Sequence, residues 1–427
     1  MIASTMSDYL PEEVLIEILS RLPVKSLLRF TCVSKPWRSL IASPSFINTH
    51  LNKSTNNTLT HLLLLRYTCL NPNQEHYSLR FDNKTFNRYA QFTSPFKTHF
   101  YFRVVGTCNG LVCLSDDRFG DKHNIILWNP MIRRYVALPK PSLSLDSYIP
   151  YMSVLGFGFD LRTNDYKVVR ISHFERRKNA IPLPKVEVYS LKTGSWKALT
   201  CGVPSYNMVE YFWEHVFLSG FAHWIAYKRV GDGKFHNVIL SFGFGDELFH
   251  EIELPETVAP TFPLQLGVHL VGTMIAVSFI DNSANHKCVS IWVMKDYGVV
   301  ESWTKQYNVD FQGGLTLVFG FRESGELLMG TRGGDMVSYQ PESKRIEKHG
   351  LRGVKGSFYA SPYVESLVLL DGSNGDLQGK VNTDPVLSKV TNEEEADEST
   401  LEIALKRNFL FAASYITGSL LEFLLRN

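Results

Sequence analysis

The sequence predicts a small N-terminal unit of three helices followed by an all-β domain, a six-bladed β-propeller. Two observations lead to this fold class. The first fifty residues carry apolar side chains at helical spacing between prolines, and beyond residue 60 strand-like segments recur at a regular interval. A propeller hides its strand edges by closing into a ring, so such a repeat can form one domain.

The first helix is predicted over residues 11–23, with a proline at each end. Proline at the first helical position costs no hydrogen bond, and Glu12 and Glu13 complement the positive end of the helix dipole. One broad face carries apolar residues at helical spacing, namely Val14, Leu15, Ile18, Leu19 and Leu22. Ile16 lies on another side, so both faces of this helix need a partner.

A second helix is predicted over about residues 26–33, and Pro36 opens a third. The pair Ser43-Pro44 is a further start signal, before Phe46 and Ile47. Helices this short are marginal alone, and a unit of roughly 40 residues is near the lower limit for independent folding. We therefore expect docking to stabilise this segment.

Five short segments between residues 9 and 51 match one known pattern in order: Leu10-Pro11, Ile18-Leu19, Arg21-Leu22-Pro23-Val24-Lys25-Ser26-Leu27, Arg29-Phe30 with Cys32-Val33-Ser34-Lys35, and Trp37-Arg38-Ser39-Leu40-Ile41. Together they resemble an F-box motif of the plant type. The resemblance implies that the unit docks on the Skp-family adaptor of a cullin-based ubiquitin ligase.

The same resemblance implies nine adaptor-binding candidates: Leu10, Pro11, Ile16, Leu19, Leu22, Pro23, Leu27, Val33 and Trp37. Some would contact the adaptor and others would hold the helices in place. The alternative, from the pattern alone, is a helical cap packed on the chain's own second domain, because apolar stripes usually face a core.

Composition bounds the class of protein. The chain has 427 residues and a net charge of +2, with 44 basic against 42 acidic residues, which gives no bulk attraction to nucleic acid or anionic membrane. Its six cysteines are spread singly without a C-x-x-C pair, and the first residues lack a secretory apolar region. We expect an intracellular protein with reduced thiols, in the cytoplasm, the nucleus or both.

A repeat organises the chain beyond residue 60. An apolar strand ends in an aromatic residue, and a polar turn and a second strand follow, at Phe81, Trp128, Tyr189, Phe242, Trp292 and Tyr339. The steps between these aromatics are 47, 61, 53, 50 and 47 residues. That interval is a blade period, and glycine-punctuated strand pairs before the hairpins bring the count to four strands per blade.

The two ends of the repeat are incomplete. The first hairpin lacks a preceding strand pair, and the strand-like segment Tyr363–Leu370 lacks a following one. We predict that they share one blade, in which strands near residues 61–92 complete a six-membered ring and hide its edges.

Six sequence segments in this region match a second known pattern: Cys108-Asn-Gly-Leu-Val-Cys, Leu127-Trp-Asn-Pro, Gly156-Phe-Gly-Phe-Asp with Asn164-Asp-Tyr-Lys-Val-Val-Arg, Val186-Glu-Val-Tyr-Ser-Leu-Lys-Thr, Phe221-Ala-His-Trp and Trp292-Val-Met-Lys. They resemble the F-box-associated, kelch-like domain of plant F-box proteins, over residues 60–371. Strict kelch blades bear a diglycine, which occurs here only at Gly313-Gly314 and Gly333-Gly334.

Target recognition on a propeller is expected on rim loops. Three loops are candidates, at residues 140–150, 173–178 and 204–213, and the second reads as a basic turn. A solvated connection is the alternative for each, and the substrate-binding residues are unknown. We interpret the repeat aromatics as packing between blades.

We find no catalytic constellation, no metal site and no cofactor motif. Cys108 and Cys113 have no second Cys or His cluster at zinc spacing and read as buried thiols. The glycine turns near Gly243 and Gly330 do not lead into a helix, as a phosphate cradle requires.

The predicted domain organisation has four parts: an F-box at residues 1–52, the β domain at 60–371, a flexible acidic linker at 372–400 and an apolar tail at 401–427. The tail is about as long as the shortest bilayer span, but Glu422 and Gly418 weaken that interpretation. We favour a terminal strand or helix docked on the propeller, or an extension from an altered gene end, over a membrane anchor.

These observations indicate a non-catalytic substrate receptor of an SCF-type ubiquitin ligase, whose helical end docks the adaptor and whose β end selects a protein for ubiquitination and degradation. Within the family, two roles remain open: an immune or hormone regulator, and a pollen S-locus F-box. A β-propeller scaffold or binding module acting outside ubiquitination is the alternative of another class. Neither the target nor the rim that binds it follows from the sequence.

Overall fold

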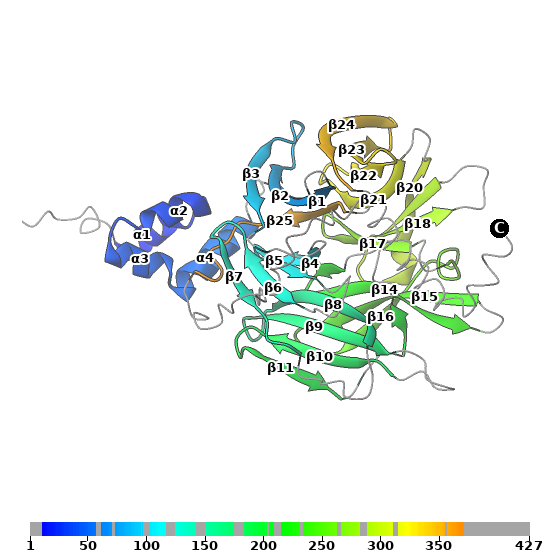
Figure 1. Ribbon diagram of the computed structural model, residues 1–427, viewed down its shortest axis with the longest axis horizontal. Helices are drawn as coiled ribbons and strands as arrows, with labels where there is room; N and C mark the ends of the chain where they lie inside the picture. The colour runs from blue at the N-terminus through cyan, green and yellow to red at the C-terminus, as the bar shows by residue number, and fades with distance from the viewer. Residues whose placement is uncertain are drawn as a thin grey trace, which may run out of the picture.

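The computed structural model describes residues 11–56, 61–70, 73–94, 96, 102–116, 124–141, 150–174, 183–200, 202, 205–208, 215–230, 234–262, 266–281, 288–310, 315–354 and 357–370. A helical unit stands at one side of a ring of β-sheets (Figure 1). The predicted linker and apolar tail, residues 372–427, lie outside the described residues.

The helical unit has four helices rather than three: α1 (Glu12–Leu19), α2 (Val24–Phe30), α3 (Lys35–Ile41) and α4 (Pro44–Thr55). The additional helix α4 begins at the predicted Ser43-Pro44 start signal. The Ser43 side chain accepts a hydrogen bond from the Phe46 N–H at 3.2 Å, and Ser34 caps α3 by accepting from the Trp37 N–H at 3.3 Å. Helix α4 then carries the chain to the β domain (Figure 1).

Six antiparallel sheets form the β domain, which confirms the six-bladed propeller. Blades are numbered along the chain, and the strands of each blade are given from the centre of the ring outward. Blade 2 has β4 (Arg103–Cys108), β5 (Leu111–Ser115), β6 (Ile125–Asn129) and β7 (Arg134–Ala137). Blade 3 has β8 (Pro150–Asp160), β9 (Asp165–Phe174), β10 (Lys185–Ser190) and β11 (Ser195–Leu199).

In blade 4, two short strands, β12 (Asn207–Met208) and β13 (Val216–Leu218), share the inner position beside β14 (Phe221–Val230), followed by β15 (Lys234–Gly243) and β16 (Phe249–Glu253). Blade 5 has β17 (Leu266–Val271), β18 (Met274–Asp281), β19 (Cys288–Met294) and β20 (Trp303–Asp310), with the 3₁₀ turn η3 (Val300–Ser302) before β20. Blade 6 has β21 (Leu315–Phe321), β22 (Leu327–Thr331), β23 (Asp335–Gln340) and β24 (Arg345–Arg352).

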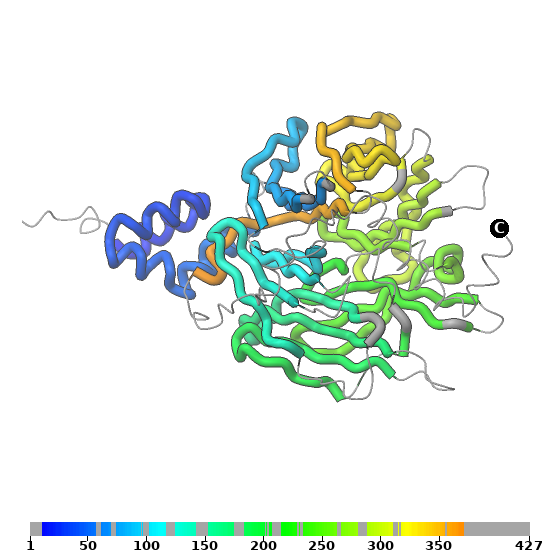
Figure 2. Tube along the Cα trace, in the orientation of Figure 1, coloured from blue at the N-terminus to red at the C-terminus, as the bar shows by residue number. Residues whose placement is uncertain are grey.

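Both ends of the repeat meet in blade 1, as predicted. Its order is β25 (Tyr359–Tyr363), β1 (Leu62–Leu70), β2 (Asn73–Phe81) and β3 (Arg88–Thr93), and β25 pairs with β1 so that Leu62 faces Tyr363. The strand ends at Tyr363, however, and residues 364–370 do not continue it as the sequence suggested. We call residues 364–370 the strap, because Figure 2 shows it leaving β25 and running toward the helical unit.

The repeat aromatics explain the period. Each of the six lies on the third strand of one blade, counted from the centre. Trp128, Tyr189 and Phe242 are buried. Trp128 packs edge-on against Tyr77 of blade 1, with ring centroids 5.2 Å apart, so this residue contributes to the packing between blades, as predicted.

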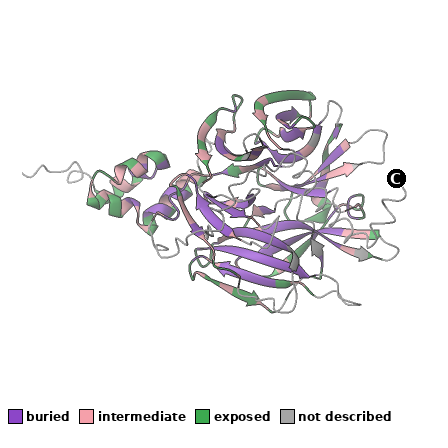
Figure 3. Cartoon of the chain, viewed as in Figure 1, coloured by how far each residue is buried: buried purple, intermediate pink, exposed green. Residues whose placement is uncertain are grey.

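Tryptophan side chains on other strands also tie neighbouring blades together. Trp224 Nε1 of blade 4 donates to the Leu155 carbonyl of blade 3 over 3.1 Å, and Trp303 Nε1 of blade 5 donates to the Glu253 carbonyl of blade 4 over 3.0 Å. The buried strand residues form the purple interior of the blades in Figure 3.

Candidate functional site

The helical unit has a small apolar core of its own. Leu19 and Leu27 are 2% and 0% exposed and cluster with Val24, Ile41 and Phe46. The buried His50 ring holds the turn after α1, because its Nε2 lies 3.0 Å from the Leu22 carbonyl oxygen. This core fixes four short helices that would be marginal separately.

Three large apolar side chains of this unit nevertheless face solvent. Val14 is 42%, Ile18 48% and Val33 63% exposed. Val14 and Ile18 are one helical turn apart on α1, and Val33 lies between α2 and α3. Figure 3 shows exposed surface on the helical unit, where the same helices also carry buried positions. Several exposed large apolar residues in so small a unit are typical of a protein that binds a partner there.

The nine predicted contact residues divide into four groups. Leu10 lies outside the described residues. Pro11, Pro23 and Val33 are exposed, and Ile16, Leu22 and Trp37 are half-buried against the core. Leu19 and Leu27 are buried and can only support the surface from within.

Val14 and Ile18 were not among the predicted contact residues. They belong to the same broad apolar face as Leu15, Leu19 and Leu22, but that face is wider than the core can cover. Leu19 lies inside the core, whereas Val14 and Ile18 occupy the outer edge of the stripe. The breadth of this apolar stripe was the sequence feature that could have identified Val14 and Ile18 as exposed residues.

The opposite side of the helical unit packs on the propeller. Val24 and Leu51 belong to one continuous apolar cluster with Leu367 and Val368 of the strap and with Leu111 of blade 2. The helical unit is therefore partly a cap on its own β domain, as the alternative interpretation held. It also keeps an uncovered apolar surface.

The propeller presents two different faces. The helix-side face carries the turns between first and second strands and between third and fourth strands, such as residues 109–110 and 161–164. The strap crosses this face, where Tyr363 Oη donates to the Gly110 carbonyl over 2.8 Å. The loop-side face is the opposite one, where second and fourth strands end, such as β9 at Phe174 and β7 at Ala137.

The first two predicted recognition loops depart from strands at the loop-side face, away from the helical unit. The third, residues 204–213, is not a loop throughout, because Asn207 and Met208 form β12 and pair with β14. Most residues of the three segments lie outside the described part of the chain. His173 is described and differs from the expected basic turn, because it is buried at the end of β9 and burial lowers its pKa to about 4. This side chain is therefore a neutral interior residue.

A cavity of about 340 Å³ lies among the inner strands. Its polar lining includes Thr107, His215, His269 and Ser361. Burial lowers the pKa of both histidines to about 4, so they are neutral near pH 7. His269 Nε2 is 2.8 Å from Ser278 Oγ, and His215 Nε2 is 3.1 Å from the Phe157 amide nitrogen.

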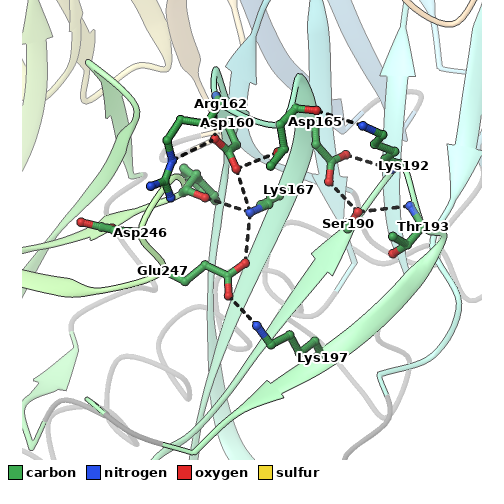
Figure 4. Close-up of polar contacts among 12 residues, drawn as sticks. Asp160, Arg162, Asp165, Lys167, Ser190, Lys192, Thr193, Lys197, Asp246 and Glu247 are labelled. Atoms are coloured by element: carbon green, nitrogen blue, oxygen red, sulfur yellow. Dashed lines mark hydrogen bonds and ion pairs between the residues drawn. The ribbon is translucent and has the colours of Figure 1, made fainter.

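A cluster of charged side chains lies at the helix-side end of the seam between blades 3 and 4 (Figure 4). Lys167 Nζ donates to Asp160 Oδ2, to Glu247 Oε1 and to the Phe244 carbonyl, each over 3.0 Å. Burial alone would lower the pKa of Lys167, but its hydrogen bonds to Asp160 and Glu247 raise it. Lys167 therefore remains a charged tie between the blades rather than a nucleophile.

Two acids of the motif Gly156–Asp160 with Asn164–Arg170 hold the turns around this cluster. Asp160 accepts from the Arg162 N–H at 2.9 Å and closes the β8–β9 turn, while Asp165 Oδ1 accepts from the Lys192 N–H at 2.9 Å. Asp165 Oδ2 also accepts from Ser190 Oγ at 2.5 Å. These carboxylates are occupied by turn and seam contacts.

Within the described ranges, no three His, Cys, Asp or Glu side chains are grouped as metal ligands. Cys108 and Cys113 are buried, as predicted. Helices in the described part of the chain are too short or too polar to cross a membrane.

Two family models match the chain. The model described as "F-box domain" matches residues 8–49, and the model described as "F-box associated beta propeller domain" matches residues 66–364. Their boundary falls at the junction between α4 and β1.

The chain is also similar to three proteins from Arabidopsis thaliana. The chain is 30% identical to "F-box protein CPR1" over 396 residues, covering 86% of the chain and 90% of the relative. It is 28% identical to "F-box protein At3g07870", covering 85% and 93%, and 29% identical to "F-box/kelch-repeat protein At3g23880", covering 70% and 79%.

Proposed function

Because the chain belongs to the family of F-box proteins with an F-box-associated β-propeller domain, we propose that it is the substrate-receptor subunit of a Skp–cullin–F-box ubiquitin ligase. The F-box binds the Skp-family adaptor and, through it, the cullin. The propeller binds a target protein, which is then ubiquitinated and degraded.

The observation that carries the proposal is the uncovered apolar surface of the helical unit. Val14, Ile18 and Val33 face solvent although the unit already packs on the propeller with its other side. We add Val14 and Ile18 to the predicted adaptor-contact residues. The proposed contact set then also contains Leu10, Pro11, Ile16, Leu22, Pro23, Val33 and Trp37. Leu19 and Leu27 hold the helices in place from the core.

The function needs no catalytic side chain in this chain. A receptor acts by holding a target lysine close to the ubiquitin-charged enzyme, which turns a bimolecular encounter into a local one. We propose that the target binds the loop-side face, where the long connections between strands depart. We expect the complex to act in the cytoplasm or nucleus, in an immune, hormonal or pollen S-locus role.

Co-purification of the full chain with a plant Skp-family adaptor tests the proposal. An Ile18→Asp, Val33→Asp variant should abolish binding, because it places charge on the exposed apolar surface without entering the core. Leu161→Asp is the matched control, since Leu161 is 81% exposed on the propeller, and it should bind normally. If the unchanged chain did not bind the adaptor, a scaffold acting outside ubiquitination would be favoured.

A further inference from the structure

The apolar surface of the helical unit has no cover within the described part of the chain. Val14, Ile18 and Val33 are 42%, 48% and 63% exposed, while the opposite side of the unit packs on the propeller. Removing such side chains from water is favourable, so they attract any apolar segment within reach. The chain contains a segment of this kind outside the described residues.

We call residues 409–425 the apolar segment. Eight of these seventeen residues are Phe or Leu, and Glu422 is the charged one among them. A run of this composition gains free energy by leaving water, whichever surface covers it. The choice of surface follows from where the chain leaves the described fold and from the charges that it carries on the way.

The chain leaves the described fold beside the helical unit. Leu370, the last residue of the strap, packs against the apolar cluster that contains Val24 of α2 and Leu51 of α4. Figure 2 shows the strap ending next to the helices. A flexible chain of 38 residues, the number between Leu370 and Phe409, has a root-mean-square span of about 35 Å, whereas α4 is about 18 Å long. The surface is therefore within reach of the apolar segment.

Opposite charges favour the same pairing. Over residues 11–56 the helical unit carries six basic and three acidic side chains. Glu17 is paired with Arg21 and Lys53. Four exposed basic residues of α2 and α3 form no ion pair with a described residue, namely Lys25, Arg29, Lys35 and Arg38. Residues 393–398, which precede the apolar segment, contain five acidic residues, so electrostatic attraction draws this part of the chain toward the helices.

Another group of exposed apolar side chains, in blade 5, lacks the basic surroundings. The turn of residues 295–301 exposes Tyr297, Val299 and Val300 by 44%, 45% and 37%. Its charged residues are two acids and one lysine, so it does not attract an acidic stretch. This turn provides a matched control surface for the test.

We propose that the apolar segment docks on the surface formed by Val14, Ile18 and Val33 of the same chain and thereby competes with the Skp-family adaptor. The competition rests on the proposed function, which assigns the adaptor to this surface, whereas the docking itself does not. Only the uncovered fraction of molecules binds the adaptor. A segment that covers the surface in about 80% of them therefore raises the apparent Kd about fivefold.

Photocrosslinking in the full chain tests the docking directly. A photoreactive amino acid in place of Val33 should form a crosslink to residues 409–425 of the same chain, and mass spectrometry identifies the joined peptides. The same amino acid in place of Val299 is the control and should not capture this segment. The proposal is overturned if position 33 captures a second copy of the chain or no part of the apolar segment, or if positions 33 and 299 capture it equally.

Adaptor titration of full-length variants tests the competition. The variant Leu420→Asp, Phe423→Asp places two charges in the apolar segment and should bind the adaptor about fivefold more tightly than the unchanged chain. The variant Asn374→Asp, Asn382→Asp adds two charges outside the segment and should bind like the unchanged chain. Equal affinity of the unchanged chain and the Leu420→Asp, Phe423→Asp variant would overturn the competition and leave the receptor function standing.

A third variant tests the contribution of charge. Glu393→Gln, Glu394→Gln, Glu395→Gln should lower the crosslinking yield from position 33 at low salt. At about 0.5 M salt the attraction is already screened, so the variant and the unchanged chain should give the same yield. An unaltered yield at low salt would contradict the charge pairing that selects this surface. If no form of the chain binds the adaptor, the receptor function is wrong, but the crosslink from position 33 still decides the docking.

Discussion

Arg322 Nε donates to Asp82 Oδ1 over 2.8 Å, across the seam where the last blade meets the first. The side chains of Arg322 and Asp82 are 4% and 5% exposed. The second carboxylate oxygen of Asp82 accepts from the Glu323 N–H at 2.8 Å, and Arg322 also reaches Glu326. This pair closes the seam on the helix-side face, at the outer side of the same blade that β25 completes.

Arg322→Ala should lower the free energy of unfolding by about 3–5 kcal/mol, because it leaves the buried Asp82 carboxylate without its partner. Chemical denaturation followed by tryptophan fluorescence measures the change. Arg21→Ala serves as the control, since Arg21 is 71% exposed in its pair with Glu17 and should leave the midpoint nearly unchanged. If Arg322→Ala and Arg21→Ala lowered the free energy of unfolding by similar amounts, the Arg322–Asp82 pair would add nothing to ring closure.

The two glycines of equivalent turns should respond differently to alanine. Gly110 and Gly220 both follow a residue with positive φ and have φ of +79° and +86°. A Cβ on Gly110 would lie 2.4 Å from Ser366 Oγ and 2.7 Å from the Val364 carbonyl, whereas a Cβ on Gly220 would have nothing within 4 Å.

We therefore expect Gly220→Ala to cost about 1 kcal/mol from backbone strain alone. Gly110→Ala should cost clearly more, because it also pushes the strap off blade 2. Thermal unfolding of both variants compares the two costs. If Gly110→Ala and Gly220→Ala shifted the melting temperature equally, the strap would move away from residue 110 without a cost in stability.

The ring was predictable because its signals are local and repeated. Each repeat aromatic marks the third strand of a blade. The first hairpin, which contains Phe81, has no strand pair before it, and this missing pair indicated that the two ends of the repeat share a blade. The end of β25 at Tyr363 was not predictable in the same way, since the apolar residues Leu367, Val368 and Leu369 suit a strand equally well. Their actual partners lie in the F-box and blade 2, which no local pattern specifies.

The candidate site shows the same limit. The sequence identified the helices and most of the surface, but not which half of the α1 stripe faces outward. That division depends on the packing of the four helices against one another, which buries Leu19 with Leu27 and Ile41 and leaves Ile18 exposed.

Adjacent residues on α1 should separate stability from binding. Leu19→Ala should destabilise the F-box by about 2–5 kcal/mol, because Leu19 is buried in its core. Ile18→Ala should leave stability nearly unchanged and weaken adaptor binding, since Ile18 is 48% exposed. Hydrogen exchange of the helices and adaptor titration measure the two effects. The assignment of α1 faces is wrong if Ile18→Ala unfolds the helices or if it binds as tightly as the unchanged chain.

Acid should destabilise the propeller through buried histidines. Burial lowers the pKa of His173, His215, His223 and His269 to about 4, below the ordinary value of 6.5. Between these values the unfolded chain binds more protons than the folded one, so stability falls as the pH is lowered from 6.5 toward 4.

Each such histidine should remove about 2 kcal/mol of stability between pH 7 and pH 5. Urea unfolding at the two pH values measures the difference. His269→Gln should reduce this pH-dependent loss by that amount. An unaltered pH dependence in His269→Gln would mean that folding does not lower the pKa of His269.

Truncation distinguishes the strap from the residues that follow it. A chain ending at Leu370 keeps β25 paired with β1 and keeps Leu367 in the cluster shared with the F-box, so it should melt at the same temperature as the full chain. A chain ending at Val354 loses Tyr359, Tyr363 and Leu367, all of them buried.

Each of these three side chains contributes about 1.5–3 kcal/mol by burial, and their sum approaches the whole stability of a typical domain. Removing β25 also exposes the edge of β1, so the shorter chain should aggregate rather than form a ring with five complete blades. Circular dichroism measures whether the two shortened chains fold, and gel filtration measures whether they aggregate. A cooperative, monomeric chain ending at Val354 would show that blade 1 does not close the propeller. A chain that unfolds when cut at Leu370 would place residues 371–427 within the folded domain.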